Sequence, residues 1–232
     1  MTINISKNGK AITSLDSWFE LAPPRGKDKQ WKDGYSAKEF ARYVCSNSYA
    51  FESHMEAILK QTGADLICDF DGIPEATSDL GDGKNNNRKP DLLLIGDKCI
   101  VSIEAKVKES FGSTVLSAKK RLVTKDERPN YLTKYLFGDK TPTDIIDSLR
   151  YQLLTATVGT IEHAKKVGKS KAYMLVLEFK EIISNKETSN DKAFKAFCNA
   201  LSIQPGGFIS CKGITCWINK KTVQIDHTYR LL

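Results

Sequence analysis

Two carboxylates and a lysine stand at the ends of two apolar segments: Asp91 comes just before the first segment, and Glu104 and Lys106 end the second. Gly96-Asp97, between the segments, has the residue types of a tight turn, so the pattern predicts a β-hairpin. Strand side chains alternate between faces, which puts the two carboxylates and the lysine on one face. Such a pair of carboxylates can hold a hard cation such as Mg²⁺ or Mn²⁺, and a lysine beside it can orient an attacking water.

The position of the turn sets the pairing of this hairpin. If the turn is centred on Gly96-Asp97, Ile95 faces Lys98. In the same register Asp91 faces Ser102, and the charged residues gather at one edge of the sheet. The residues expected on the opposite, apolar face are Leu92, Leu94, Val101, Ile103 and Ala105.

The composition is typical of a folded soluble protein. The chain has 232 residues, of which 41% are hydrophobic and 27% charged, enough for one domain with a full core. No apolar run approaches the roughly 20 residues that cross a bilayer, and the N-terminal residues lack the apolar core of a signal peptide, so we expect a cytoplasmic protein without a membrane partner. The six cysteines contain no CxxC pair and are expected to be reduced, and the net charge of +7 favours a polyanionic partner.

Apolar periodicity predicts alternating helices and strands along the rest of the chain. The order helix, strand, strand, strand, helix, strand predicts an α/β fold, in which the long helix is a right-handed crossover between parallel strands. We expect a single domain over residues 1–232. Helices are predicted over 36–44, 49–62, 193–201 and from Thr143 to Gly168, strands over 64–73 and 172–179, and a C-terminal hairpin over 213–227 that turns at Asn219-Lys220.

Pro90-Asp91 and Glu104-Ala105-Lys106, on this order of elements, resemble the motif of the PD-(D/E)XK nuclease superfamily. The resemblance covers about residues 49–179. It implies a restriction-endonuclease-like αβββαβ core with a mixed central sheet flanked by helices. Residues 1–48 would then be an N-terminal helical extension, and residues 190–232 a C-terminal helix and β-hairpin.

The resemblance implies a metal-dependent nuclease that hydrolyses phosphodiester bonds of nucleic acid, with DNA expected rather than RNA and Mg²⁺ or Mn²⁺ as cofactor. In that superfamily the aspartate and glutamate bind the metal and the lysine assists hydrolysis, which assigns these roles to Asp91, Glu104 and Lys106. Shorter runs, including Trp31-Lys32-Asp33-Gly34 and Arg150-Tyr151-Gln152-Leu153, look like those of an uncharacterised bacterial family.

Three further residues are candidates for the same site. The superfamily often takes another acid from the helix before the first strand, where Glu56 lies one turn from Glu52. Glu75, after the first strand, competes with Glu56 as the third metal ligand. Gln152, one turn inside the long predicted helix and flanked by Arg150 and Tyr151, could reach the site or a phosphate. Each of the three has an ordinary structural alternative. Glu56 would be a solvated helix residue, Glu75 a loop carboxylate, and Gln152 would form a helix-to-loop hydrogen bond.

Candidate contacts to the nucleic-acid backbone are basic residues near aromatic ones. Arg25, Lys29 and Lys32 flank Trp31, which could stack on a base, and Arg150 precedes Tyr151. A solvated loop with its tryptophan in the core is the alternative. Many enzymes of this superfamily cut two strands as dimers, so a homodimer is left open.

Two other functions stay open. A non-catalytic nucleic-acid-binding or protein-interaction module of the same fold would hold Asp91 and Glu104 in local salt bridges. The run Asp69-Phe70-Asp71-Gly72 is similar to the nucleophile motif of haloacid dehalogenase-like phosphatases. That motif usually continues with Thr or Val where this chain has Ile73, so Asp69 and Asp71 are expected to be outward residues of the first strand.

Overall fold

The computed structural model describes residues 1–83, 88–121, 127–138, 141–181 and 186–225. Its strands are β1 (Ile3–Lys7), β2 (Lys10–Ala11), β3 (Phe70–Pro74), β4 (Leu92–Gly96), β5 (Ile100–Lys106), β6 (Lys171–Lys180), β7 (Phe208–Cys211) and β8 (Ile214–Gln224). Its helices are α1 (Leu15–Leu21), α2 (Ser36–Ser46), α3 (Ser48–Lys60), α4 (Val115–Arg121), α5 (Arg128–Phe137), α6 (Thr143–Ser148), α7 (Tyr151–Lys166) and α8 (Ser189–Ala200), with a 3₁₀ turn η1 (Lys27–Lys29).

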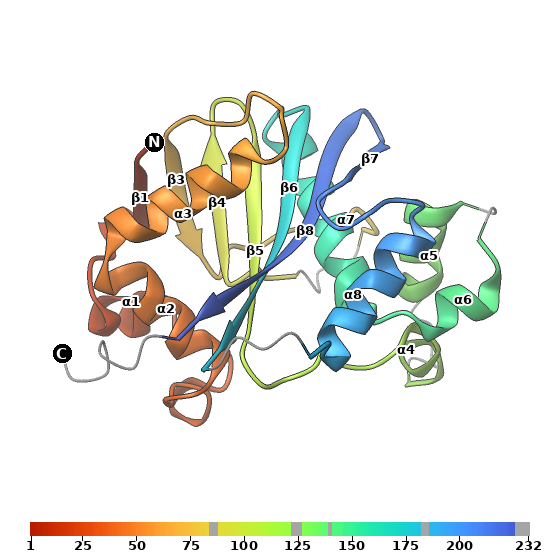
Figure 1. The fold of residues 1–232 in the computed structure, drawn as a ribbon, viewed down its shortest axis with the longest axis horizontal. Coiled ribbons are helices and arrows are strands. Elements are labelled where there is room, and N and C mark those ends of the chain that lie inside the picture. Colours follow the sequence, from red (N-terminus) through yellow and green to blue (C-terminus); the bar gives the residue numbers. More distant parts are fainter. Residues whose placement is uncertain (84–87, 122–126, 139–140, 182–185, 226–232) are drawn as a thin grey trace.

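The strands form one mixed sheet in the order β2-β1-β3-β4-β5-β6-β8-β7 (Figure 1). Strands β3, β4 and β5 form an antiparallel meander, whereas β5, β6 and β8 run parallel to one another. Helix α7 lies in the connection from β5 to β6, as expected for a crossover. The predicted α/β fold with a mixed central sheet flanked by helices is therefore confirmed.

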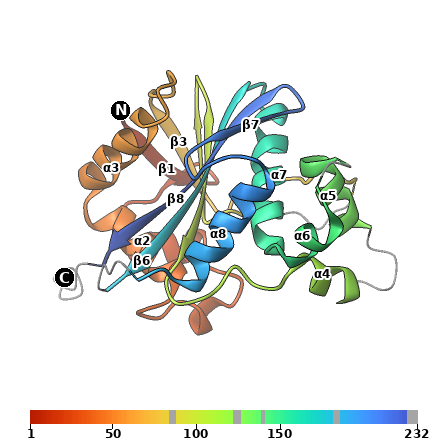
Figure 2. The ribbon, with the colours of Figure 1, turned by 45° about the vertical axis from the view of Figure 1, so that its right-hand side comes forward.

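Helices cover both faces of the sheet, and each face has its own apolar core. Figure 2 shows α2 and α3 on one side of the sheet and α4 to α8 on the other. Strand β6 is buried on both faces, which explains why its sequence is almost wholly apolar. The five hairpin residues predicted on one apolar face, Leu92, Leu94, Val101, Ile103 and Ala105, all lie in the core beneath α1, α2 and α3.

The β4–β5 hairpin forms, but its pairing differs from the prediction by two residues. Ile95 pairs with Ile100, and the four-residue connection is closed by a 3.0 Å hydrogen bond from Gly96 N to Cys99 O. A Cβ atom at Gly96 would lie 2.4 Å from Cys68 Sγ, so only glycine fits there. A shift of two residues keeps the alternation of faces. It brings Asp91 level with Glu104 instead of Ser102.

The long helix predicted from Thr143 is divided into α6 and α7. Leu149 and Arg150 between them are extended, with ψ angles of 155° and 121°. The backbone on either side of Arg150 is hydrogen-bonded to a distant segment. Val115 N donates to Leu149 O at 2.9 Å, and Tyr151 N donates to Ser113 O at 3.0 Å. This long-range pairing interrupts a helical pattern that is continuous in the sequence.

The C-terminal hairpin turns earlier than predicted. Strand β8 continues through Asn219, whose amide is buried and donates to Tyr173 Oη at 3.0 Å. The turn lies instead at Lys212-Gly213, where both residues have positive φ (53° and 79°), as a two-residue type I′ hairpin requires. Residues 226–232 of the expected addition lie outside the described part of the chain.

The first strands also differ from the prediction. The N-terminal extension is not wholly helical, because β1 joins the sheet parallel to β3. Strand β3 begins at Phe70, later than predicted, after a tight turn in which Leu66 N donates to Ala64 O at 2.9 Å. Among the helices described, none offers the length of apolar sequence that a bilayer crossing requires.

Candidate functional site

Asp91 lies directly before β4, at the end of the sheet where β5 finishes. Its Oδ2 accepts a 2.7 Å hydrogen bond from Ala105 N, which fixes the carboxylate across the hairpin. Burial and the negative charge of Glu104 raise the pKa of Asp91 to about 7, against the opposing charges of Lys106 and Arg88. The register of the hairpin places Asp91 level with Glu104, and the two negative charges act on each other.

Glu104 is buried on the sheet face that α7 covers, and both of its oxygens have partners. Oε2 accepts a 2.7 Å hydrogen bond from Gln152 Nε2, so the candidate at the start of α7 does reach the site. Oε1 forms an ion pair with the guanidinium of Arg88. The carboxylate is thus held from two elements far apart in the sequence.

Arg88 is a site residue that was not predicted from the sequence. Its side chain is only 8% exposed, and Nη1 also donates to Ser102 Oγ at 3.3 Å. The backbone of Arg88 pairs with that of Ser78, and a Cβ at Gly159 of α7 would lie 3.3 Å from Arg88 Cδ. The helix therefore leaves room for the arginine. Its place two residues before Pro90 was the only signal in the sequence.

Lys106 ends β5 on the same face as Glu104. The residue is 7% exposed, and its charge acts on the carboxylate of Asp91. Within the described residues, no hydrogen bond or ion pair occupies its amine. Lys106 thus differs from Arg88, whose charge is already committed to Glu104.

Glu75 follows β3, and its backbone and its charge both interact with Asp91. Its φ of 49° lies in the left-handed region, and its N–H donates to Asp91 O at 3.3 Å. Lys7 Nζ donates to Pro74 O at 2.7 Å and steadies this turn. Burial, followed by the charge of Asp91, raises the pKa of Glu75 to about 7, although Lys7 and Lys89 oppose the shift.

Glu56, the competing third ligand, does not lie at the site, which corrects the prediction. The apolar side of α3 packs into the core on the face opposite to Glu104. Glu56 points to solvent and pairs with Lys60 at 2.6 Å. Its neighbour Glu52 accepts a 2.8 Å hydrogen bond from Ile3 N, so it supports β1 instead.

The basic N-terminal loop borders the acidic residues. Pro24 and Trp31 line a small cavity together with Glu75 and Asp91. Trp31 packs on Phe19 with ring centroids 5.2 Å apart, which agrees with the core alternative for this tryptophan. The three expected contacts on this loop, Arg25, Lys29 and Lys32, are exposed, as is Lys27.

Arg150, the fourth expected nucleic-acid contact, is turned toward the protein. Its Nη1 donates to Gly112 O at 2.9 Å, and its backbone pairs with Thr114. The arginine thus has a structural role at the α6–α7 break. The rival phosphatase motif also lacks support: Asp69 precedes β3 and accepts a 2.7 Å hydrogen bond from Thr2 N, whereas ligands of α/β sheets bind beyond the carboxyl ends of strands.

The donor chemistry of the site suits a hard divalent cation, but the arrangement is not a closed metal cage. Carboxylate oxygens of Asp91, Glu104 and Glu75 are the ligand type that Mg²⁺ and Mn²⁺ prefer. Within the residues that the structure describes, however, no three His, Cys, Asp or Glu side chains converge closely enough to hold a metal ion. A cation at Glu104 would have to share that carboxylate with Arg88 or displace it.

Residues 11–221 match the model of a family described as Domain of unknown function (DUF6946). No curated protein matches the chain. No solved structure matches it either. Because the matched region spans most of the chain, the protein belongs to the DUF6946 family.

Proposed function

We propose that this protein is a metal-dependent nuclease that hydrolyses phosphodiester bonds of nucleic acid, with DNA as the expected substrate. The observation that carries the proposal is the convergence of Asp91, Glu104 and Lys106 at one end of the sheet, with Gln152 bound to Glu104. Glu75 joins them from β3. These groups come from separate segments and match the donors, the amine and the polar helix residue that such hydrolysis needs.

The order of elements supports a restriction-endonuclease-like core. Helix α3, the meander of β3, β4 and β5, the crossover helix α7 and the parallel strand β6 follow the αβββαβ order. The departure is the acid expected from the first helix, because Glu56 lies on the other face of the sheet. Glu75 takes its place in the proposal.

Each residue of the site has a distinct proposed task. A bound divalent cation would supply charge stabilisation for the pentavalent phosphorus and polarise its oxygen ligands. Gln152 orients the carboxylate of Glu104, and the amine of Lys106 orients the attacking water. Glu75, whose pKa burial and the charge of Asp91 raise to about 7 in the metal-free protein, would supply a third carboxylate to that cation.

A second candidate function rests on Arg88. Because the arginine and Gln152 occupy both oxygens of Glu104, the site also suits a module that binds nucleic acid without cutting it. In that module Glu104 and Arg88 are a permanent buried ion pair. The two functions differ in one measurable property, which is turnover in the presence of a divalent cation.

Cleavage assays with the Lys106→Ala variant test the nuclease proposal. The full chain is incubated with duplex DNA, single-stranded DNA and RNA in Mg²⁺ or Mn²⁺. We expect cleavage by the wild type and a loss of at least about a hundredfold in the variant, because general acid–base groups contribute rates of that order. Lys171→Ala is the control, since Lys171 begins β6 at the opposite end of the sheet.

Circular dichroism and thermal unfolding of both variants check that the fold is kept. Binding without cleavage by the wild type on every substrate would favour the non-catalytic module. Cleavage that persists in Lys106→Ala would contradict the role given to the amine.

A further inference from the structure

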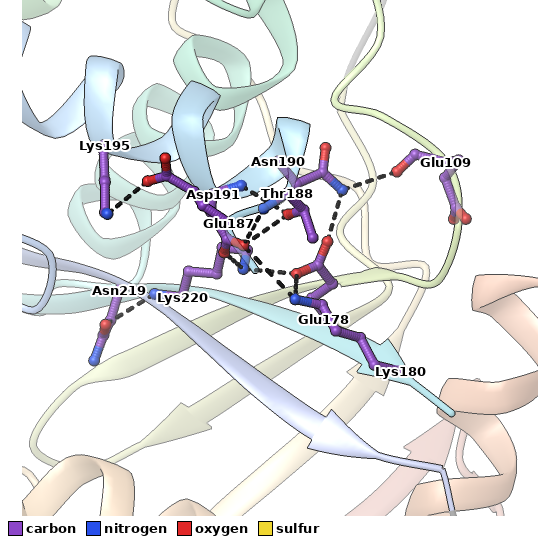
Figure 3. Close-up of polar contacts among 10 residues, drawn as sticks. All are labelled: Glu109, Glu178, Lys180, Glu187, Thr188, Asn190, Asp191, Lys195, Asn219 and Lys220. Atoms are coloured by element: carbon purple, nitrogen blue, oxygen red, sulfur yellow. Dashed lines mark hydrogen bonds and ion pairs between the residues drawn. The ribbon is translucent and has the colours of Figure 1, made fainter. Parts of the chain in front are cut away.

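A second polar cavity, of about 350 Å³, opens on the sheet face that carries Glu104. Figure 3 shows the ion pairs around it, which join the ends of β6 and β8 to the start of α8. Its lining holds four lysines against two carboxylates, an excess of two positive charges. The polar residues of the lining are Lys180, Lys186, Glu187, Asp191, Lys195, Lys220 and Thr222.

The register of the sheet places this cavity close to the candidate active site. Lys106 of β5 pairs with Glu178 of β6, and Glu178 pairs with Thr222 of β8. Paired residues of neighbouring strands point to the same face. Two strand spacings amount to about 10 Å, the rise of about three nucleotides along one strand of B-DNA.

Buried ion pairs hold the inner lysines in fixed positions. Lys220 Nζ lies 2.7 Å from Glu178 Oε2 and 2.5 Å from Asp191 Oδ1. Lys180 Nζ also approaches Glu178, at 3.1 Å, and Asn190 donates to the other oxygen of that carboxylate at 3.0 Å. When the carboxylate of Glu178, which pairs with these lysines, is added to the charges of the lining, the excess falls from two positive charges to one.

The outer lysine is easier to redirect. Lys195 pairs with Glu187 at 2.6 Å, but their side chains are 61% and 39% exposed. Exposed ion pairs contribute little, so a phosphate can take over this ammonium group. The start of α8 borders the cavity, because Glu187 and Asp191 on either side of its N-cap Thr188 line it, and these two carboxylates offset the positive end of the helix dipole.

We propose that this lysine cavity, formed by the residues given above, binds a backbone phosphate of the nucleic-acid strand that is cut at Asp91 and Glu104. The inference rests on the proposed function and assigns the direction in which the strand leaves the site. A lysine ammonium group binds a backbone phosphate through its charge alone. Such a contact holds the strand in position without reading its base sequence. The strand would cross the carboxyl ends of β5, β6 and β8 in turn.

Fluorescence anisotropy with a labelled single-stranded DNA of about 12 nucleotides tests the subsite, with the full chain in EDTA over a series of salt concentrations. Lys195→Gln is expected to weaken binding at least about threefold and to reduce the log–log salt slope by roughly 0.7, the value for one lost phosphate contact on a single strand. Glu187→Gln, which frees Lys195, is expected to tighten binding.

Lys60→Gln is the matched control. Lys60 forms the same kind of pair, with Glu56 at 2.6 Å and a side chain 63% exposed, but lies on α3 across the sheet. Equal effects of Lys60→Gln and Lys195→Gln would overturn the subsite. Competition by inorganic phosphate at the potency of the strand would also overturn it, because the cavity would then be a free-phosphate site.

Cleavage is measured separately, so the two proposals can fail independently. If the strand binds through Lys195 but is never cut, the subsite stands and the nuclease proposal fails. If the strand is cut and Lys195→Gln binds it as tightly as the wild type does, the nuclease proposal stands and the subsite fails.

Discussion

Arg88 gives Glu104 a positive partner inside the protein, and this contact decides how the site responds to a cation. The guanidinium lies on Oε1 and Gln152 on Oε2, beneath α7. A buried carboxylate that loses such a partner keeps its desolvation cost without compensation. A divalent cation at Asp91 and Glu104 is the natural substitute for the lost charge.

Replacing Arg88 with methionine therefore tests whether Glu104 faces a cation site. We expect Arg88→Met to lower the free energy of unfolding by about 3 kcal/mol in EDTA, because the buried ion pair is broken. Millimolar Mn²⁺ should restore part of this loss in the variant. The measurement is urea unfolding with and without Mn²⁺.

Lys60→Met serves as the control, because Lys60 belongs to an exposed pair and its loss should change little. An unfolding free energy of Arg88→Met that is the same in EDTA and in Mn²⁺ would show that Glu104 does not contact the cation.

The raised pKa values of Asp91 and Glu75 make the stability of the metal-free protein depend on pH. Both values are about 7, so the folded state holds protons that the unfolded state has already released above about pH 5. Stability from these groups is present at low pH and is lost as the pH rises through about 7.

Asp91→Asn removes one of these titrations and keeps an oxygen for the Ala105 hydrogen bond. The free energy of unfolding of this variant, minus that of the wild type, is expected to rise by on the order of 2 kcal/mol from about pH 5 to about pH 8 in EDTA. Each pKa unit corresponds to about 1.4 kcal/mol. Denaturant unfolding at the two pH values provides the comparison. A wild-type-minus-variant difference that does not vary with pH would show that the Asp91 pKa is not raised.

At the scale of elements, the hairpin was predictable because two kinds of local signal agree. Turn residues at Gly96-Asp97 and alternating apolar residues on both sides set the parity of the faces, and parity survives the two-residue change of register. Asp91 and Glu104 therefore share a face in the predicted register and in the observed one, because the two registers differ by an even number of residues. Gln152 was predicted one turn inside the long helix, and it lies instead in the first turn of α7, because that helix begins at Tyr151.

The elements that were missed depend on contacts between distant segments. Arg88 reaches Glu104 only because its backbone pairs with Ser78 and Gly159 leaves room on α7. Leu149 is not helical, because its carbonyl accepts a hydrogen bond from Val115 N. Asn219 lies within a strand, where its amide donates a hydrogen bond to Tyr173 Oη. Local propensity carries no information about such partners.

In the whole molecule, the two faces of the sheet carry different helices and have different roles. One face carries α1 to α3 and its own apolar core, which explains why Glu56 cannot join the site. The other face brings Glu104, Lys106 and the lysine cavity to the carboxyl ends of β5, β6 and β8, whereas Asp91 and Glu75 also line the small cavity beside α1 and α2. The net charge of +7 fits a polyanionic strand that follows this edge.

The most direct test of the account is calorimetric titration of Mn²⁺ into the wild type, Asp91→Asn and Glu56→Gln. The wild type and Glu56→Gln are expected to bind Mn²⁺ alike, and Asp91→Asn is expected to bind at least about tenfold more weakly, a difference of about 1.4 kcal/mol. Glu56→Gln is the matched control because it removes a carboxylate from the opposite face of the sheet. Equal Mn²⁺ affinity of Asp91→Asn and the wild type would contradict the metal site on which the proposed nuclease depends.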